Sequence, residues 1–258
     1  MIVEEDLLRN STHFMDERQL EKNYLQVLLL YELYSRFSRD IVFKGGTALK
    51  LFYGLDRFSE DLDFTYDGKE NAAGIINAVD NTFRTIDSMY NIIKQKRRGT
   101  ATSLDFEIKL AGPLYASRKT AQAIELNISM REKVLLPPVI REIVPSYLDL
   151  GPFFVYVMDI NEILYEKIRA ILTRKYIKAR DIYDVSYIFR TQKVDFDVDI
   201  INKKLAYYGK TFSMAEFVKR LESIEEKLWK SEMSNLIREV SKYGSTRDYI
   251  LLKIRGKH

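Results

Sequence analysis

The part of the chain that most limits its fold is an early run of strand, glycine turn, helix and second strand. Residues 41–43 are apolar with two β-branched members, which favours a short strand, and this run stops at Gly45-Gly46. Thr47 has the side chain of a helix cap and predicts a short helix that closes after Tyr53. Residues 62–66 then read as the next strand. This order predicts a sheet in which a glycine turn and a strand lie close together.

Other segments show the periodicities of helices and strands. Apolar residues at steps of three and four predict a helix over 17–38, and we read 71–93 as a second long helix. Apolar and polar residues alternate over 104–110 and again over 124–128, so two more strands are expected there. The amino-terminal half therefore has an α+β pattern.

The composition of the chain changes near residue 137. Prolines become frequent there, which indicates a connecting region. We expect a last strand over 153–158. Two pairs then have the form of capping boxes that open helices, Asp159 with Glu162 and Ser213 with Glu216. We predict an α+β domain over residues 1–150 and a mostly helical domain over 151–258, with the boundary between 135 and 155.

Composition removes several kinds of chemistry. The 258 residues include no Cys and only two His, which excludes disulfides, thiol nucleophiles and Cys/His zinc sites and makes a His-based triad implausible. The longest apolar run, within residues 25–34, is too short to span a membrane, and residues 1–6 do not resemble a leader. We expect a cytoplasmic monomer without a membrane partner. A net charge of +4 identifies no partner.

Two carboxylates follow the glycine turn closely. Asp61 and Asp63 are two residues apart at the start of a predicted strand, so their side chains share a face at a separation of about 6–7 Å. Mg²⁺, or Mn²⁺ in its place, would relieve their repulsion, because hard cations prefer oxygen ligands. Gly45 and Gly46 allow backbone N–H groups to approach an anion, and Thr47 adds a hydroxyl donor. An Asp-x-Asp pair alone is more often a solvated turn.

These residues together resemble a known signature. Gly46-Thr47 followed by Arg57-x-Ser59-x-Asp61-x-Asp63-Phe is similar to the motifs of the nucleotidyltransferase superfamily, specifically the AbiEii/AbiGii-type toxins of type IV toxin–antitoxin systems. The resemblance implies a mixed sheet with flanking helices, and Arg57 and Ser59 among the nucleotide-binding residues. It also implies a metal-dependent transfer of NMP from an NTP to a hydroxyl acceptor, with RNA such as tRNA as the expected acceptor and a cognate antitoxin as partner.

The superfamily usually has a third carboxylate on a neighbouring strand. In residues 123–128 the apolar side chains alternate with Glu125 and Asn127, so Glu125 is the candidate third ligand and base. Asp105 and Glu107 on the preceding predicted strand compete with it.

A second resemblance lies in the helical half. Lys167 and the later Asp181 and Asp184 match the family's Lys and Arg-Asp-x-x-Asp motifs, which implies that Lys167 holds a triphosphate and that an aspartate orients it. On one unbroken helix Lys167 and Asp181 would lie about 21 Å apart. If both serve one site, the chain must reverse between residues 174 and 179. The alternative is a surface helix with an Arg180–Asp184 pair.

Basic residues gather in three places and would suit an RNA backbone, although such runs are usually solvated. The cluster expected in a turn contains Lys94, Lys96, Arg97 and Arg98. The cluster along the motif helices contains Arg169, Arg174, Lys175, Lys178 and Arg180. The cluster in the tail contains Lys253, Arg255 and Lys257. Two rival interpretations remain. One is a catalytically silent nucleotide- or RNA-binding module of the same fold, and the other is a structural partner whose carboxylates are merely solvated.

Overall fold

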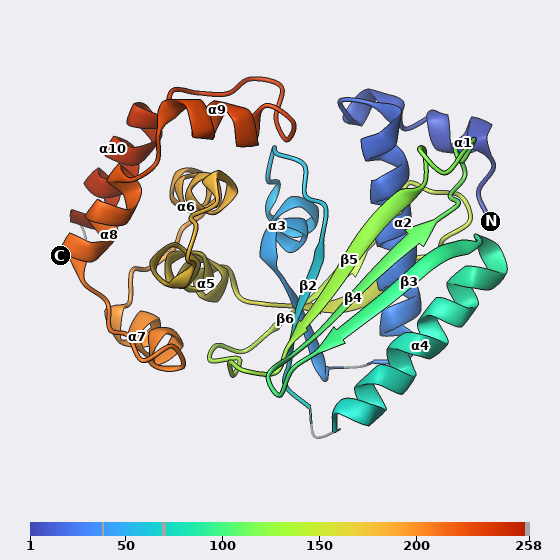
Figure 1. The fold of residues 1–258 in the computed structure, drawn as a ribbon, viewed down its shortest axis with the longest axis horizontal. Helices are drawn as coiled ribbons and strands as arrows, with labels where there is room; N and C mark the ends of the chain where they lie inside the picture. Colours follow the sequence, from blue (N-terminus) through green and yellow to red (C-terminus); the bar gives the residue numbers. More distant parts are fainter. Residues whose placement is uncertain (38, 69–70, 256–258) are drawn as a thin grey trace. The chain divides into compact units, whose positions relative to one another are not determined.

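The fold combines a mixed seven-stranded sheet with helices (Figure 1). The computed structural model describes residues 1–37, 39–68 and 71–255, so Ser38 of the first predicted helix and Lys257 of the basic tail lie outside the described residues. The strands are β1 Ile41–Lys44, β2 Leu62–Tyr66, β3 Ile92–Gly99, β4 Ser103–Leu110, β5 Gln122–Ser129, β6 Val139–Ile143 and β7 Phe153–Val157. The helices are α1 Glu4–Leu8, the 3-10 turn η1 Ser11–His13, α2 Glu17–Tyr34, α3 Gly45–Tyr53, α4 Ala72–Met89, α5 Ile160–Thr173, α6 Ala179–Thr191, α7 Val198–Ala206, α8 Met214–Glu222, α9 Glu226–Met233 and α10 Tyr243–Arg255.

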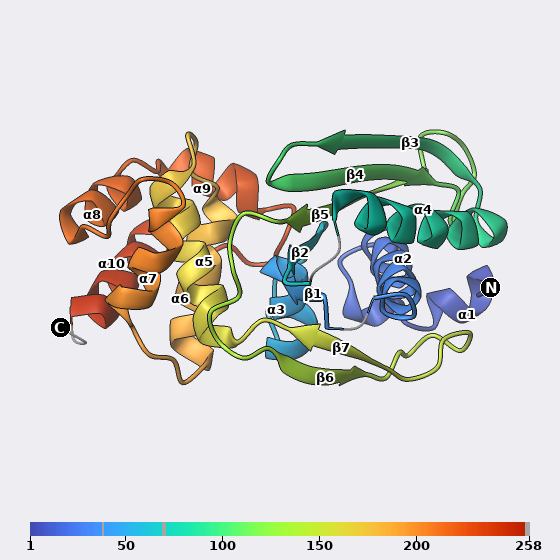
Figure 2. The same ribbon diagram turned by 90° about the horizontal axis from the view of Figure 1, so that it is seen from below.

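The sheet has the strand order β3-β4-β5-β2-β1-β7-β6. The pairs β1–β7 and β2–β5 are parallel, and the remaining neighbours are antiparallel. Its central strands are the apolar runs 41–44 and 62–66, which are almost entirely buried. Helices α2 and α4 pack together on one side of the sheet. They lie between strands β3 to β5 and strands β6 and β7 (Figure 2). The α+β fold class expected from the sequence is confirmed.

Internal contacts divide the chain into two compact units. Unit 1 contains Met1–Ala48, Glu60–Val134 and Pro138–Val157, and unit 2 contains Leu49–Ser59, Leu135–Pro137 and Met158–His258. The chain therefore enters unit 2 at the middle of α3 and returns to unit 1 just before β2. We call residues 54–60, between α3 and β2, the α3–β2 link.

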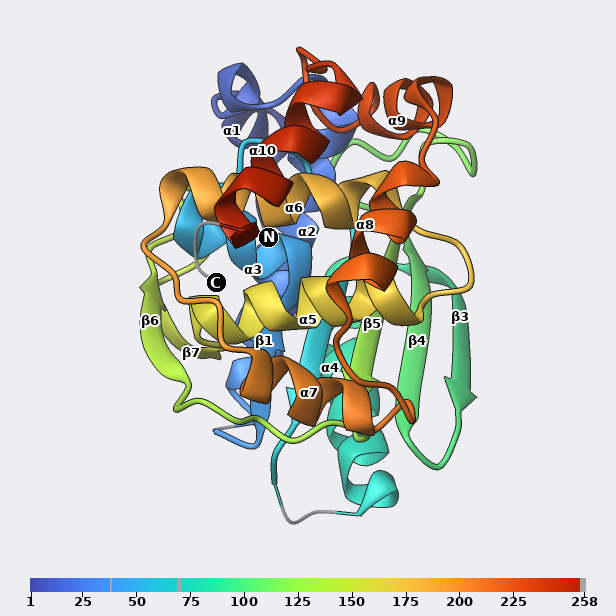
Figure 3. The same ribbon diagram turned by 90° about the vertical axis from the view of Figure 1, so that its left-hand side faces the viewer.

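Unit 2 is built around the antiparallel pair α5 and α6, which lie side by side with α7 next to α5 (Figure 3). Helix α5 ends at Thr173 and α6 begins at Ala179, so the chain reverses within the span predicted from Lys167 and Asp181. Asp159 accepts a hydrogen bond from the N–H of Asn161 and caps α5 as expected. In the part of the chain that the structure describes, no helix is both long and apolar enough to cross a membrane.

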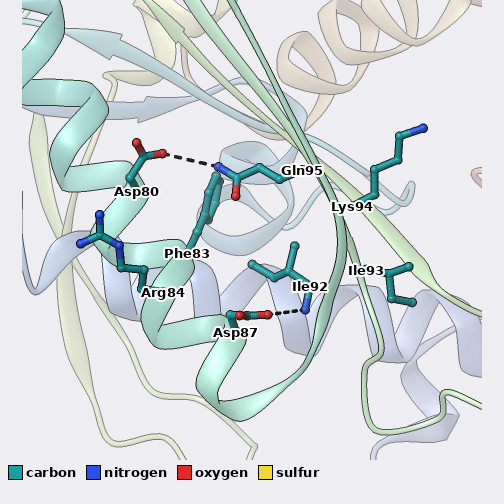
Figure 4. A pocket seen from close by; sticks show the side chains of 8 residues that line it. All are labelled: Asp80, Phe83, Arg84, Asp87, Ile92, Ile93, Lys94 and Gln95. Atoms are coloured by element: carbon teal, nitrogen blue, oxygen red, sulfur yellow. Dashed lines mark hydrogen bonds between the residues drawn. The ribbon is translucent and has the colours of Figure 1, made fainter.

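Residues 90–99 differ from the expectation of a helix to 93 followed by a basic turn. Helix α4 stops at Met89, and the Asp87 carboxylate accepts a hydrogen bond of 2.7 Å from the N–H of Ile92, where β3 begins (Figure 4). The four basic residues of 94–98 thus lie on an edge strand. A strand at the edge of a sheet tolerates many charged side chains, so apolar alternation was too weak to reveal it. A hollow of about 400 Å³ is lined by the second half of α4 and the start of β3.

Glu162 also departs from its expected capping role. Its carboxylate accepts hydrogen bonds from the N–H groups of Leu135 and Leu136 and contacts the ammonium of Lys204, with Nζ–Oε1 at 2.5 Å. The same ammonium lies 2.9 Å from Glu166 Oε1. The Lys204 side chain is entirely buried, so its charge is balanced within unit 2 by these two carboxylates.

Candidate active site

The glycine turn and the carboxylate strand are in direct contact in unit 1. Gly45, which opens α3, has φ +79°, a conformation that residues with a side chain rarely adopt. A Cβ placed on Gly45 would lie 2.5 Å from Asp63 Oδ2. Only glycine therefore lets the start of α3 approach this carboxylate so closely.

Thr47 serves the site in another way than the cap predicted for it. The helix begins two residues earlier, at Gly45, so Thr47 lies inside its first turn. The Thr47 hydroxyl donates a hydrogen bond of 2.5 Å to the backbone carbonyl of Asp61. This bond holds Asp61, the residue before β2, against the first turn of α3.

Asn127 is the residue that β5 places beside Asp63. The two are partners in the β2–β5 register, and the Asn127 side-chain amide donates a hydrogen bond of 3.1 Å to Asp63 Oδ1. Glu125 is exposed on the same face of β5, opposite Glu107 of β4, and Asp105 is opposite Asn127. Among the described residues, no cluster of three Asp, Glu, His or Cys side chains is arranged for a metal ion.

The sequence contained a signal for Asn127, since it alternates with Glu125 on the same strand face. Because Mg²⁺ prefers carboxylate ligands, the alternation points to Glu125 and not to the neighbouring amide. The parallel β2–β5 register, which decides between the two positions, depends on a long-range pairing.

A divalent cation fits the side chains present. The Asp63 carboxylate lies over the bare backbone of Gly45, where no Cβ intrudes, and Asp61 stands two residues before it, next to the start of β2. Mg²⁺ commonly binds one or two protein carboxylates and completes its octahedron with water and phosphate oxygens. One or two carboxylates would therefore be a sufficient protein contribution to such a site.

In unit 2, the residues of the second motif form one ion cluster. Lys167 Nζ lies 3.0 Å from Asp181 Oδ1 and 2.7 Å from Asp184 Oδ2. Asp181 also contacts the guanidinium of Arg174. Burial alone would raise the pKa of Asp181, but the charges of Lys167 and Arg174 hold that pKa below its ordinary value. Asp181 is therefore ionised at neutral pH.

Arg57 belongs to the same cluster. Its Nε and Nη2 donate to the two oxygens of Asp184 at 2.6 and 2.7 Å, and both side chains are buried. Asp184 is thus the partner of Arg57 and Lys167, in contrast to the surface Arg180–Asp184 pair weighed above. Ser59, the other motif residue of the link, is buried as well.

Gly45→Ala is expected to damage the unit 1 site, because the methyl group forces Asp63 to move in addition to straining the backbone. Gly209→Ala is the matched control, since Gly209 has φ +64° but no atom lies within 4 Å of the point that a Cβ would take there. We expect Gly209→Ala to lose about 1 kcal/mol of unfolding free energy and Gly45→Ala clearly more. Chemical denaturation measures both, and equal losses would contradict the close approach at Gly45.

Comparisons with known structures support the fold. The Helicobacter pylori protein JHP933 matches with a TM-score of 0.61 and 19% identity over 95% of this chain and 94% of its own. A second H. pylori protein, described as a candidate nucleotidyltransferase, matches with a TM-score of 0.63 and 20% identity over 95% of this chain and 96% of its own. At such identities the likeness shows a shared fold. No curated protein matches this chain by sequence.

The family model for the nucleotidyl transferase AbiEii toxin of type IV toxin–antitoxin systems matches residues 28–250. This range includes the glycine turn, the Asp61–Asp63 pair and the whole ion cluster of unit 2. The chain belongs to the AbiEii family of nucleotidyl transferase toxins of type IV toxin–antitoxin systems.

Proposed function

We propose that this toxin transfers NMP from an NTP to a hydroxyl group of RNA, in a reaction that depends on Mg²⁺ or Mn²⁺ held by Asp61 and Asp63. A bond forms between the acceptor oxygen and the α-phosphorus of the NTP. The bond from that phosphorus to the bridging oxygen breaks, pyrophosphate leaves, and the acceptor proton passes to a carboxylate base. The ion would neutralise phosphate charge and orient the acceptor.

The contact between Gly45 and Asp63 is the observation that carries this proposal. A glycine held at positive φ against a carboxylate has no use in a solvated turn, but it joins an anion-binding helix start to a cation-binding strand. In this proposal the N–H groups of Gly45 and Gly46 face phosphate oxygens. The Thr47 hydroxyl fixes the backbone of Asp61.

Lys167 is proposed to hold the triphosphate as a point charge. An ammonium group has three donors, and Asp181 and Asp184 take two of them. No other described residue accepts from Lys167, and 12% of its side chain is exposed. The remaining donor suits a phosphate oxygen, while Asp181 and Asp184 keep the amine charged.

Glu125 stays our candidate for the base that accepts the hydroxyl proton. It is exposed on the same face of β5 as Asn127, which contacts Asp63. Asp105 and Glu107 on β4 remain its competitors. Glu125→Gln, Asp105→Asn and Glu107→Gln tested in parallel would choose among them, because a base acts only when deprotonated and its removal abolishes the acidic limb of the pH–rate profile.

Incubation with each labelled NTP, Mg²⁺ and total RNA tests the whole proposal. Label entering RNA would support it and would identify both the nucleotide and the acceptor. Metal-dependent NTP binding without incorporation would instead favour a silent binding module of the same fold. A cognate antitoxin is expected to suppress the toxicity of the active chain in cells.

A further inference from the structure

We propose that Arg57 is a positioning residue, which orients Asp184 and through it the ammonium of Lys167. The proposal rests on the function assigned above to Lys167. The guanidinium of Arg57 meets Asp184 with two hydrogen bonds, Nε to Oδ1 and Nη2 to Oδ2. Lys167 Nζ contacts the same Oδ2 at 2.7 Å. Asp184 therefore joins the arginine to the lysine.

Arg57 is poorly placed to touch a nucleotide itself. Only 1% of the residue is exposed, and its remaining Nη1 group donates to the carbonyl of Phe58 at 2.8 Å. All three nitrogen atoms thus have partners within unit 2. Two of its five N–H donors are left over, but with so little of the residue exposed a nucleotide could reach them only by opening the protein interior.

Holding the α3–β2 link in place does not require the Arg57–Asp184 pair. Tyr187 of α6 and Gln192, which follows α6, donate to the carbonyl of Tyr53 at the end of α3, and Tyr183 donates to Asp56 Oδ1 at 2.7 Å. The N–H of Phe58 donates to the carbonyl of Leu236 at 2.7 Å. A buried ion pair would stabilise the link no more than apolar packing would, because the cost of desolvating the two charges offsets much of their attraction.

The geometry of the pair points to orientation instead. An arginine fork bound to both carboxylate oxygens fixes the plane of the carboxylate as well as its position. With the plane of Asp184 fixed, Oδ2 is held toward Lys167, and the second acceptor, Asp181 Oδ1, fixes the other N–H direction. The third donor of Lys167 then has one direction, which is the direction a phosphate would need.

A double-mutant cycle on phosphate binding tests this. Inorganic tripolyphosphate with Mg²⁺ is the probe, titrated by calorimetry into the full chain. We expect Arg57→Lys, which keeps the charge but loses the fork, to weaken binding about five- to tenfold. Lys167→Met should weaken it about tenfold or more, and the double variant no further, because Arg57 acts only through Lys167.

Two further variants separate positioning from mere stability. Asp184→Asn keeps the shape of the side chain and should also be non-additive with Lys167→Met. Tyr183→Phe removes another tie of the link without touching Asp184, and it should leave the affinity unchanged while lowering thermal stability slightly. Rescue of binding in Arg57→Lys by stabilising osmolytes would show that only stability had been lost, and would overturn the proposal.

The binding measurements distinguish a failure of the positioning role of Arg57 from a failure of the proposed transfer reaction. Multiplying effects of Arg57→Lys and Lys167→Met would show that Arg57 acts independently, and an unchanged affinity in Arg57→Lys would show that it does not act at all. Unchanged binding in Lys167→Met would remove the role of Lys167 and this inference with it. A non-additive cycle in a chain that never labels RNA would support the positioning role and refute only the transfer reaction.

Discussion

Replacing Asp61 and Asp63 together by alanine is expected to lower nucleotide incorporation at least about 10³-fold while the fold stays intact. The loss follows because catalysis of this kind consists of positioning and charge neutralisation, and the pair supplies the protein's contribution to the ion. The labelled-NTP assay measures incorporation, and Mn²⁺ titration measures metal binding. Both signals should disappear in the double variant.

Asp67→Ala is the matched control for this experiment. Asp67 directly follows the other end of β2 and its side chain is exposed, so its removal changes the charge near the strand while Asp61 and Asp63 stay in place. Its incorporation should equal that of the unchanged protein. Full incorporation by the Asp61→Ala, Asp63→Ala protein would contradict the role of the two aspartates. Circular dichroism with thermal melting shows whether a loss of activity comes from unfolding.

Lys204→Met has the largest expected effect on stability. The substitution removes the only buried cation that contacts both Glu162 and Glu166 among the described contacts, and it leaves two carboxylates with little solvent nearby. Loss of one partner from a buried ionic group costs about 3–5 kcal/mol of unfolding free energy. For a chain of this size that corresponds to a fall in Tm of roughly 10 °C.

Lys203→Met is the control for this substitution, because Lys203 is the adjacent lysine on α7 and is exposed. Its unfolding free energy should stay within about 0.5 kcal/mol of the unchanged protein. Equal stability of the two variants would mean that Glu162 and Glu166 accept protons or water without cost. Burial acts to lower the pKa of Lys204, but Glu166 and Glu162 raise it above the ordinary value. The stabilisation is therefore complete at neutral pH and is lost only as pH rises above about 10.4.

Local pattern was enough to predict the elements that carry chemistry in unit 1. The apolar run at 41–43 predicts β1, and the segment 62–66 predicts β2, because both belong to the middle of the sheet, where most side chains are buried. The reversal after Thr173 followed from a length argument, since one helix cannot bring Lys167 and Asp181 together.

What could not be predicted depends on pairings between distant segments. Asn127 contacts Asp63 only because β5 joins β2 in parallel, a register that neither strand encodes alone. The partner of Arg57 is 127 residues away, and nothing in the local sequence of the link indicates it. Glu162 had the spacing of a capping residue, but the N–H groups of Leu135 and Leu136 compete for the same carboxylate.

The return of the chain through unit 2 between α3 and β2 also sets an order of assembly during synthesis. Arg57 leaves the ribosome well before its partner Asp184. The interval between Phe58 and Leu236, whose carbonyl accepts from the N–H of Phe58, is longer still. At roughly 5–20 residues per second, Asp184 follows Arg57 after about 6–25 seconds and Leu236 follows Phe58 after about 9–36 seconds. The neighbours of β2 in the sheet are made by residue 129, whereas the link acquires its last partner only when almost the whole chain has been made.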